Sequence, residues 1–294
     1  MTMAEKTLLI ELFQPFAQYR NPFTFYYAQT YPLPPKSTII GMLQNALDDW
    51  YGQREGLEKW WSLKVSVHGG FESVFWNYQQ LIKGEISLVR FYGRPILWNQ
   101  WTTKKEKGKV NQGPVYPNHD LSLKRSPAPV SQQELFNGWL YILLRHENEG
   151  FLEKIKNALE RPRKVLSLGR SEDVIFIRNV RFINESEVKP DDAIELGIIY
   201  PTYVYVKSPF DMLERLEYPT YYLPVKVIFK NGEKPVGHKV EINERTFRDV
   251  EFKPVIHVGP WKYLGLKKEI PFEEYRLGKV VLRVPNGKEV SGWL

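Results

Sequence analysis

Two stretches with helical periodicity, each enclosed by stretches with strand character, restrict the fold of this chain more than any other feature. In the first, apolar residues recur at i, i+4, i+7, i+8 and i+11, which is one face of a helix. These residues are Ile39, Leu43, Ala46, Leu47 and Trp50. We expect Ser37 to be the N-cap, because its hydroxyl can accept from free backbone N–H groups, and the helix to end near Gly52. A second helix is predicted over residues 150–160, before Pro162.

Strand patterns stand before, between and after these two helices. They cover residues 6–13, 63–80, 138–145 and 164–183, and glycines predict a break in the second and in the fourth. The order strand–helix–strand followed by strand–helix–strand is the βαββαβ order of the ferredoxin-like, RRM-like split motif. Two helices with apolar stripes can then cover one face of an antiparallel sheet. We therefore predict an α+β fold with a ferredoxin-like domain over residues 1–188.

The remainder of the chain has a different character. Residues 184–192 are polar, and we expect them to form a linker. Short strand patterns follow at residues 200–206, 221–229, 236–242, 252–258 and 279–284. The pair Asn231–Gly232 favours a hairpin turn, because both residue types tolerate a positive φ. These patterns predict a smaller β-rich C-terminal domain over residues 189–294.

The segment between the second and third strand patterns, about residues 81–132, has no convincing helical period. Between Leu81 and Val130 nine Lys or Arg residues face three acidic ones, so this stretch holds +6 of the chain's formal +7. The isoelectric point of about 9.2 passes the limit of ~9 above which a nucleic-acid partner is suspected. One interpretation is an arm or hairpin that lies along a nucleic-acid backbone, with nearby Trp101 stacking on bases. The alternative is a solvated surface loop.

Two shorter segments are also candidates for phosphate contacts. Lys36 and Ser37 open the first helix, where free backbone N–H groups favour an anion; the alternative is an ordinary N-cap. Gly169 permits close approach of a ligand to the backbone, and Arg170 could clamp phosphate or stack on a base. The alternative for this segment is a β-bulge with a surface salt bridge.

Several classes of chemistry are excluded or have no motif. The chain has no cysteine, which excludes Cys-ligated zinc, iron–sulfur clusters and thiol catalysis. Its five histidines are scattered without metal-ligand spacing, so we expect no metal and no cofactor. The N-terminal residues lack the apolar run of a signal peptide, and no segment has the ~20 apolar residues of a membrane span. We expect a soluble cytoplasmic protein without a membrane partner.

Three motifs in this order resemble the Cas-five family of CRISPR-associated proteins, which belongs to the RAMP superfamily of repeat-associated RNA-binding proteins. They are Phe16-Ala-Gln-Tyr-Arg20, Tyr31-Pro-Leu-Pro-Pro-Lys-Ser-Thr-Ile-Ile-Gly-Met-Leu43 and Leu168-Gly-Arg-Ser-Glu-Asp173. The resemblance covers about residues 5–185. It implies a non-catalytic subunit of a type I RNA-guided surveillance complex (Cascade) in antiviral defence. Such a subunit caps the backbone filament and holds the 5′ handle of the CRISPR RNA (crRNA), while its inserted hairpin, the thumb, reaches over the guide.

The resemblance also implies partners and contact residues. The partners are crRNA, the backbone subunit and the large subunit, with target DNA contacted indirectly through the complex. The basic segment 81–132 lies where the thumb would be, and Tyr19 and Arg20 are candidates for base stacking and phosphate contact. The full set of expected RNA contacts is Tyr19, Arg20, Lys36, Ser37, Arg90, Arg94, Trp101, Lys104, Lys105, Lys107, Lys109, Lys124, Arg125, Gly169, Arg170 and Ser171.

Two alternatives stay open within this resemblance. One branch of the family is a metal-independent endoribonuclease that trims precursor crRNA with a Tyr and an adjacent Lys-His pair. No Lys-His dipeptide exists here, since His119 follows Asn118 and His146 follows Arg145, so we expect no catalytic residue. The other alternative is the equivalent RNA-capping subunit of a type III complex.

Overall fold

The computed structural model describes most of the chain. The described residues are 6–24, 27–81, 86–91, 94–99, 128–191, 197–198, 200–214, 217–231, 234–235, 246–259, 262–263, 265–267 and 269–294. Among them the helices are few and the strands many, so the chain is an α+β protein built on a large antiparallel sheet. No helix in these ranges is long and apolar enough to cross a membrane.

The two helical connections join four strands of the large sheet. These strands are β1 (Thr7–Ala17), β3 (Lys64–Leu81), β6 (Ala128–Arg145) and β7 (Phe176–Phe182), and they lie in the order β3-β6-β1-β7. Every neighbouring pair is antiparallel. The order along the chain is strand, helix, strand, strand, helix, strand, as the sequence predicts. In the sheet, the first strand, β1, and the third, β6, form the centre of this part.

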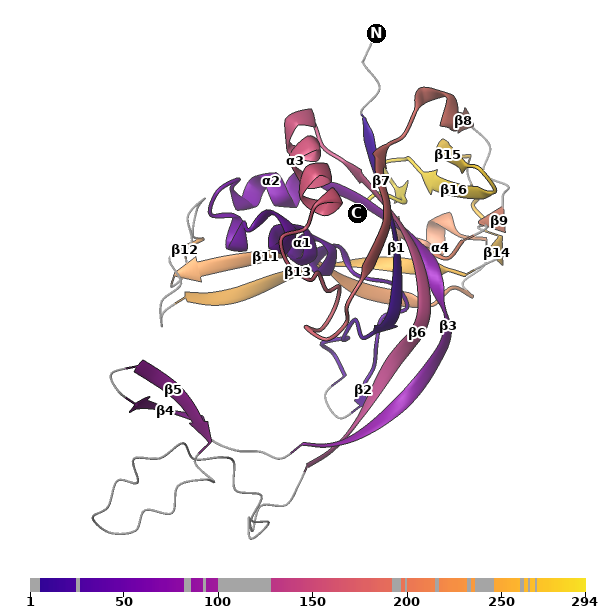
Figure 1. Cartoon of the computed structure of the whole chain (residues 1–294). Helices are drawn as coiled ribbons and strands as arrows, with labels where there is room; N and C mark the ends of the chain where they lie inside the picture. Colours follow the sequence, from indigo (N-terminus) through magenta and orange to yellow (C-terminus); the bar gives the residue numbers. More distant parts are fainter. Residues whose placement is uncertain are drawn as a thin grey trace, which may run out of the picture.

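The helices α1 (Lys36–Leu47), α2 (Leu57–Ser62) and α3 (Glu149–Glu160) lie on one face of these strands (Figure 1). The prediction of an N-cap at Ser37 is wrong: Pro35 is the N-cap, and its carbonyl accepts from the N–H groups of Thr38 and Ile39. The predicted end near Gly52 is also late. Asp48 turns left-handed at φ 58° and ends α1, and a 3₁₀ turn (Trp50–Gly52) and the unpredicted α2 follow.

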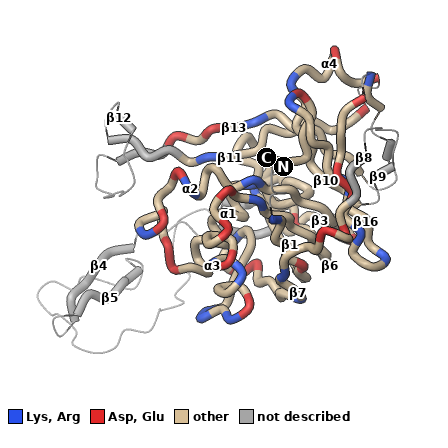
Figure 2. The backbone as a smooth tube through the Cα atoms, turned by 90° about the horizontal axis from the view of Figure 1, so that it is seen from above, with Lys and Arg blue, Asp and Glu red and all other residues tan. Residues whose placement is uncertain are grey.

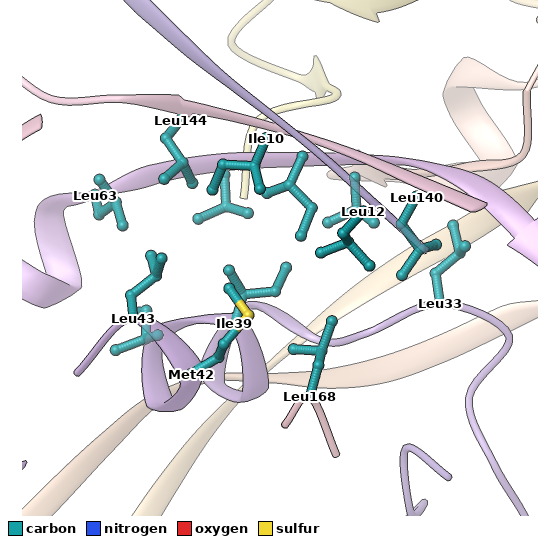
Figure 3. Packing of buried hydrophobic residues seen from close by; sticks show 14 of the residues in the cluster. Ile10, Leu12, Leu33, Ile39, Met42, Leu43, Leu63, Leu140, Leu144 and Leu168 are labelled. Carbon is teal, nitrogen blue, oxygen red and sulfur yellow. The ribbon is translucent and has the colours of Figure 1, made fainter. Parts of the chain in front are cut away.

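The largest apolar core lies between these helices and the sheet. Side chains of β1 and β6 face those of α1 and the segment before it (Figure 3). The labelled residues in this layer are Ile10, Leu12, Leu33, Ile39, Met42, Leu43, Leu63, Leu140, Leu144 and Leu168. Each fully buried Leu or Ile stabilises the fold by roughly 1.5–3 kcal/mol. Of the apolar stripe predicted for the first helix, Ile39 and Leu43 are buried here, and Ala46 and Leu47 pack against this core. The prediction is wrong for Trp50, which is 51% exposed and lies in the 3₁₀ turn after α1.

The large sheet continues into the C-terminal part of the chain. Strands β10 (Thr202–Val206), β13 (Thr246–Val258) and β11 (Thr220–Asn231) follow β3 in that order, and Thr202 pairs with His68 of β3. The main core includes Tyr203, Leu223 and Val255 from these strands, so it spans the boundary expected at residue 188. The division of the chain into two domains at that residue stays a prediction.

A smaller sheet covers part of the other face of the central strands. It has the order β16-β15-β8, with β8 at Val188–Asp191, β15 at Phe272–Leu277 and β16 at Val280–Pro285. The predicted linker at 184–192 is therefore wrong for its described part, which forms a 3₁₀ turn (Glu185–Glu187) and then β8. The remaining elements are β2 (Tyr27–Ala28), β9 (Gly197–Ile198), α4 (Pro209–Met212), β12 (Lys234–Pro235), β14 (Lys262–Tyr263) and β17 (Val290–Ser291).

The two strands that flank the basic segment are longer than predicted. Strand β3 continues through Gly69 and Gly70 without the expected break, since Gly69 adopts φ 128° and pairs with Leu140. A Cβ at Gly69 would lie 2.1 Å from the carbonyl oxygen of Trp139, so no other residue fits. Strand β6 begins at Ala128, ten residues before the predicted start, and stays paired with β3 as far as Leu81. We call the part of this pair beyond Gly70 and Trp139 the arm.

A second hairpin lies within the predicted insertion. Strands β4 (Ile86–Phe91) and β5 (Arg94–Asn99) pair antiparallel with each other. In Figure 1 they lie apart from the main sheet, near the outer end of the arm. A hairpin is thus present in the described part of the predicted insertion, while residues 100–127 lie outside the described residues. That this insertion forms the thumb stays a prediction.

Candidate nucleic-acid interface

The glycine of the third motif is required by the backbone of its loop. Gly169 has φ 117°, which favours glycine, and it lies in the loop closed by an isolated β-bridge between Ser167 and Val174. A Cβ on Gly169 would lie 2.7 Å from Oδ2 of Asp173 and 2.9 Å from the carbonyl oxygen of Gln18. The loop is therefore packed closely against the end of β1, and glycine serves this packing.

The side chain of Arg170 is occupied by carboxylates. Its Nη2 lies 2.8 Å from Oδ1 of Asp173, and its Nη1 lies 2.7 Å from Oε1 of Glu134 on β6. Partial burial opposes the charge, but hydrogen bonds to both carboxylates outweigh it and raise the pKa of Arg170 above its usual value. The side chain of Arg170 is only 21% exposed. These ion pairs correspond to the salt-bridge alternative for this segment. In this conformation Arg170 therefore positions the loop and is not free to bind phosphate.

Tyr19 is an internal residue. It is 2% exposed, its hydroxyl donates to Oε1 of Gln14 at 2.5 Å, and its ring meets Phe71 edge-on. Gln14 in turn donates to the carbonyl oxygen of Leu168, which links the first motif to the third. Burial raises the pKa of Tyr19 well above its usual value. The ring cannot stack on a base in this conformation, whereas the next residue, Arg20, is exposed.

Lys36 is also internal. It is 7% exposed, and its Nζ donates to the carbonyl oxygens of Trp61 at 3.1 Å and Leu294 at 3.0 Å. Burial, together with the charge of Lys253, lowers the pKa of Lys36 to about 8. Its ammonium group therefore ties α1 to distant segments and does not face solvent as a phosphate contact. Ser37 is half-buried and lines a cavity of about 180 Å³.

Few of the expected thumb contacts fall on described residues. Arg90 and Arg94 lie on β4 and β5 at the closed end of that hairpin, where Phe91 pairs with Arg94. Trp101, Lys104, Lys105, Lys107, Lys109, Lys124 and Arg125 lie outside the described residues. In the coloured part of Figure 2, the positions of basic and acidic residues are interspersed along the backbone. This distribution agrees with a charge excess concentrated in the insertion.

The sequence pattern does not reveal the exposed aromatic residues, because aromatic residues in strands resemble core residues. On the arm, Trp76 is 51% exposed and its ring lies edge-on to that of Tyr27, and Tyr78 is 62% exposed. On the central strands, Trp139 and Phe176 are 47% and 51% exposed. Their clustering depends on strand register, which periodicity alone does not provide.

The described histidines do not form a catalytic pair. The backbone N–H of Asn148 donates to Nδ1 of His146, so a neutral ring carries its proton on Nε2 and donates to Oγ of Ser62. That ring cannot accept the serine proton. Burial lowers the pKa of His68 to about 3 and that of His257 to about 4, which keeps both neutral. The described residues contain no group of three His, Asp or Glu placed to hold a metal.

Comparison with known proteins identifies one family. A family model described as CRISPR-associated protein (Cas_Cas5) matches residues 7–259. No curated protein sequence matches the chain significantly. The match spans the central sheet, α1, α3 and the segments that contain all three motifs.

Solved structures with low identity are also similar. A chain from a CRISPR RNA-guided surveillance complex has 13% identity and a TM-score of 0.46, with 89% of this chain and 91% of that chain covered. A crystal structure of a Cas protein has 18% identity and a TM-score of 0.40, with coverages of 84% and 95%. A CRISPR protein from Archaeoglobus fulgidus has 11% identity and a TM-score of 0.39, with coverages of 96% and 100%.

Proposed function

Because this chain belongs to the CRISPR-associated Cas5 (Cas-five) family, we propose that it is a non-catalytic subunit of a type I RNA-guided surveillance complex, Cascade, in antiviral defence. It binds the 5′ handle of crRNA and caps the backbone filament, next to the backbone and large subunits in the cytoplasm. The observation that carries the proposal is the family match over residues 7–259.

The fold supports an RNA-binding role. Strand order β3-β6-β1-β7 with α1 and α3 on one face is the ferredoxin-like arrangement, which RNA-recognition modules also use. The arm extends from two strands of this sheet and leads into the basic segment. RNA held there would contact Arg20, the exposed Ser171, the backbone at Gly169, Arg90, Arg94 and the basic residues beyond them. Tyr19, Lys36 and Arg170 would shape this surface from within.

Charge reversal in the basic segment tests the proposal. Replacing Lys104, Lys105, Lys107 and Lys109 by Glu removes four candidate phosphate contacts. For single-stranded RNA, each phosphate contact makes the negative slope of log affinity against log salt concentration steeper by about 0.7. We expect weaker binding of repeat-derived RNA and a shallower salt dependence. Unchanged RNA binding and unchanged assembly with the other subunits would refute the thumb role.

Incubation of the pure protein with labelled repeat RNA in EDTA tests the non-catalytic part of the proposal. We expect the RNA to stay intact, because the described histidines form no proton-transfer pair. A specific cleavage product would instead assign the chain to the processing branch of the family. Neighbouring genes would distinguish a type I from a type III complex.

A further inference from the structure

Three aromatic rings lie side by side on neighbouring strands of the central sheet. Phe13 on β1 pairs in register with Trp139 on β6 and with Phe176 on β7. The ring centroid of Phe13 is 5.1 Å from that of Trp139 and 6.3 Å from that of Phe176. Trp139 and Phe176 are about half exposed. The rings therefore form a continuous aromatic strip across three strands.

Arg178 completes this strip. The pairing of β7 with β1 shifts its register between Glu11 and Leu12, so β7 has an extra residue here. Arg178 is exposed, and its guanidinium carbon lies 5.8 Å from the ring centroid of Phe13 and 5.6 Å from that of Trp139. Among the described residues Arg178 has no carboxylate within ion-pair distance, whereas nearby Arg181 is paired with Glu187.

The strip lies on the sheet face opposite to the helices. Side chains alternate along a strand, so Phe13 shares a face with Leu9, and Trp139 shares a face with Leu143. Leu9 and Leu143 are fully buried and pack with Tyr275 of β15 under the small sheet. Four residues further along β1, the exposed rings are not covered in this way by described residues.

A groove lies along β7, between this strand and the C-terminal end of α3, and it shares Phe176 and Arg178 with the strip. It has a volume of about 690 Å³ and is lined by Phe176, Arg178 and Lys164, with Glu160 as its acidic member. The exposed Arg161 and Arg163 precede Lys164 in the chain, and Nζ of Lys164 lies 2.6 Å from Oδ1 of Asp48. The lining is mostly apolar. With the exposed Arg161 and Arg163 nearby in the chain, this region suits a ligand with flat bases and negative phosphates.

From these contacts we propose that Phe13, Trp139, Phe176 and Arg178, here called the aromatic platform, stack the bases of single-stranded RNA. In RNA-recognition sheets of βαββαβ order, aromatic residues on the sheet face stack two or three bases. Phe13 and Trp139 occupy the first and third strands of that order, which are the central pair. Arginine adds a planar cation that stacks on bases and binds phosphate.

This proposal rests on the proposed function and makes it more specific. The aromatic platform is a base-stacking site separate from the thumb. Further exposed rings lie along the same strands toward the arm. Phe16 is 5.2 Å from Phe136 and 6.4 Å from Phe75, measured between ring centroids. An RNA strand on the platform could therefore continue toward the basic segment.

Binding of a short fluorescently labelled oligouridine and of labelled repeat RNA, followed by anisotropy, tests the platform. We expect Trp139→Ala, Phe176→Ala and Arg178→Ala each to raise the Kd for either RNA roughly tenfold. The two ring variants should leave the salt slope unchanged, because they remove no charge. Trp50→Ala and Phe210→Ala are matched controls, since these residues are 51% and 76% exposed and lie away from the platform. Circular dichroism and the Tm verify folding.

The outcomes separate the two proposals. If the platform variants bind both RNAs like the wild type while the charge-reversed thumb variant does not, the platform is refuted and the proposed function stands. The exposed rings would then be assigned to a protein partner, to be tested by subunit pull-down. If the platform variants lose affinity but repeat RNA binds no better than oligouridine, the platform stands and the handle role falls. A wild-type chain that binds neither RNA overturns both.

Discussion

Oδ1 of Asp173 lies 2.8 Å from Nη2 of Arg170, and this contact closes the loop that carries Gly169. The other carboxylate oxygen, Oδ2, accepts from the backbone N–H groups of Gln18 and Arg170. One buried carboxylate therefore fixes the loop, the arginine and the end of β1 together. The third motif is a structural clamp that holds the first motif in place.

Asp173→Ala should destabilise the protein strongly. It leaves two backbone N–H groups without their acceptor and removes one of the two carboxylates that hold the Arg170 guanidinium. Breaking a buried ion pair in this way costs about 3 kcal/mol or more. Urea denaturation would measure the loss. Glu172→Ala is the control, because Glu172 is 62% exposed and 3.4 Å from Arg170, and it should change little. Equal losses in both variants would contradict the role of Asp173.

Alanine should have opposite effects at two glycines. Gly169→Ala forces a side chain into φ 117° and into contact with Asp173 and Gln18, which should cost about 1–3 kcal/mol or more. Gly41→Ala lies inside α1 with nothing within 4 Å of the added Cβ, so it should stabilise by ~0.5–1 kcal/mol. Thermal denaturation of both variants gives the sign directly. A stable Gly169→Ala would show that the loop can relax.

Lys36 should make stability depend on pH in the alkaline range. Its pKa is lowered to about 8 in the folded state, from 10.5 as the ordinary value, so the unfolded chain binds more protons between these values. Stability from this group therefore rises as pH increases from about 8 to 10.5, by roughly 3 kcal/mol in total. The gain reflects loss of a buried charge.

The difference in unfolding free energy between wild type and Lys36→Met, measured by denaturant titration across this range, isolates the effect. Groups common to both proteins cancel in that difference. Lys207→Met, at an exposed lysine, provides the matched control and should show a flat difference. A flat curve for Lys36→Met as well would mean that Lys36 is not buried as a charged group.

Arg145 should couple the small sheet to the central one. Its Nε donates to Oγ1 of Thr7 at 2.8 Å, its Nη2 lies 2.7 Å from Oε2 of Glu273, and its guanidinium carbon is 4.6 Å from the ring centroid of Trp293. Arg145→Leu leaves Glu273 largely without its cation and should cost roughly 3 kcal/mol. Hydrogen exchange should show β15 and β16 losing protection before β1 and β6.

The matched control for that variant is Lys6→Ala. The pair of Lys6 and Glu149 is more than half exposed on both sides, so its loss should leave exchange rates unchanged. Protection lost evenly over both sheets in Arg145→Leu would instead indicate one cooperative unit.

Local patterns were sufficient for the elements that depend on neighbours in the chain. The stripe that includes Ile39 and Leu43 predicts the buried face of α1. The helix α3 ends before Pro162, as expected. The order of strands and helices follows from these periods, because an apolar face must be covered. The basic segment and the family resemblance were likewise visible in the amino-acid sequence. Boundaries were less accurate, since Pro35, not Ser37, caps α1.

The roles of individual candidate residues were decided by tertiary structure. Lys36, Tyr19 and Arg170 are residue types that often contact phosphates and bases, yet in the fold each is buried or paired with other parts of the protein. Lys36 bonds to Leu294, and Arg170 to Glu134. Conversely, Phe13, Trp139 and Arg178 meet only because register and a bulge bring three strands together. Residue types and their spacing in the sequence therefore determined the class of fold. Burial and strand register are properties of the assembled sheet. For that reason only the tertiary packing determined which side chains are available to a ligand.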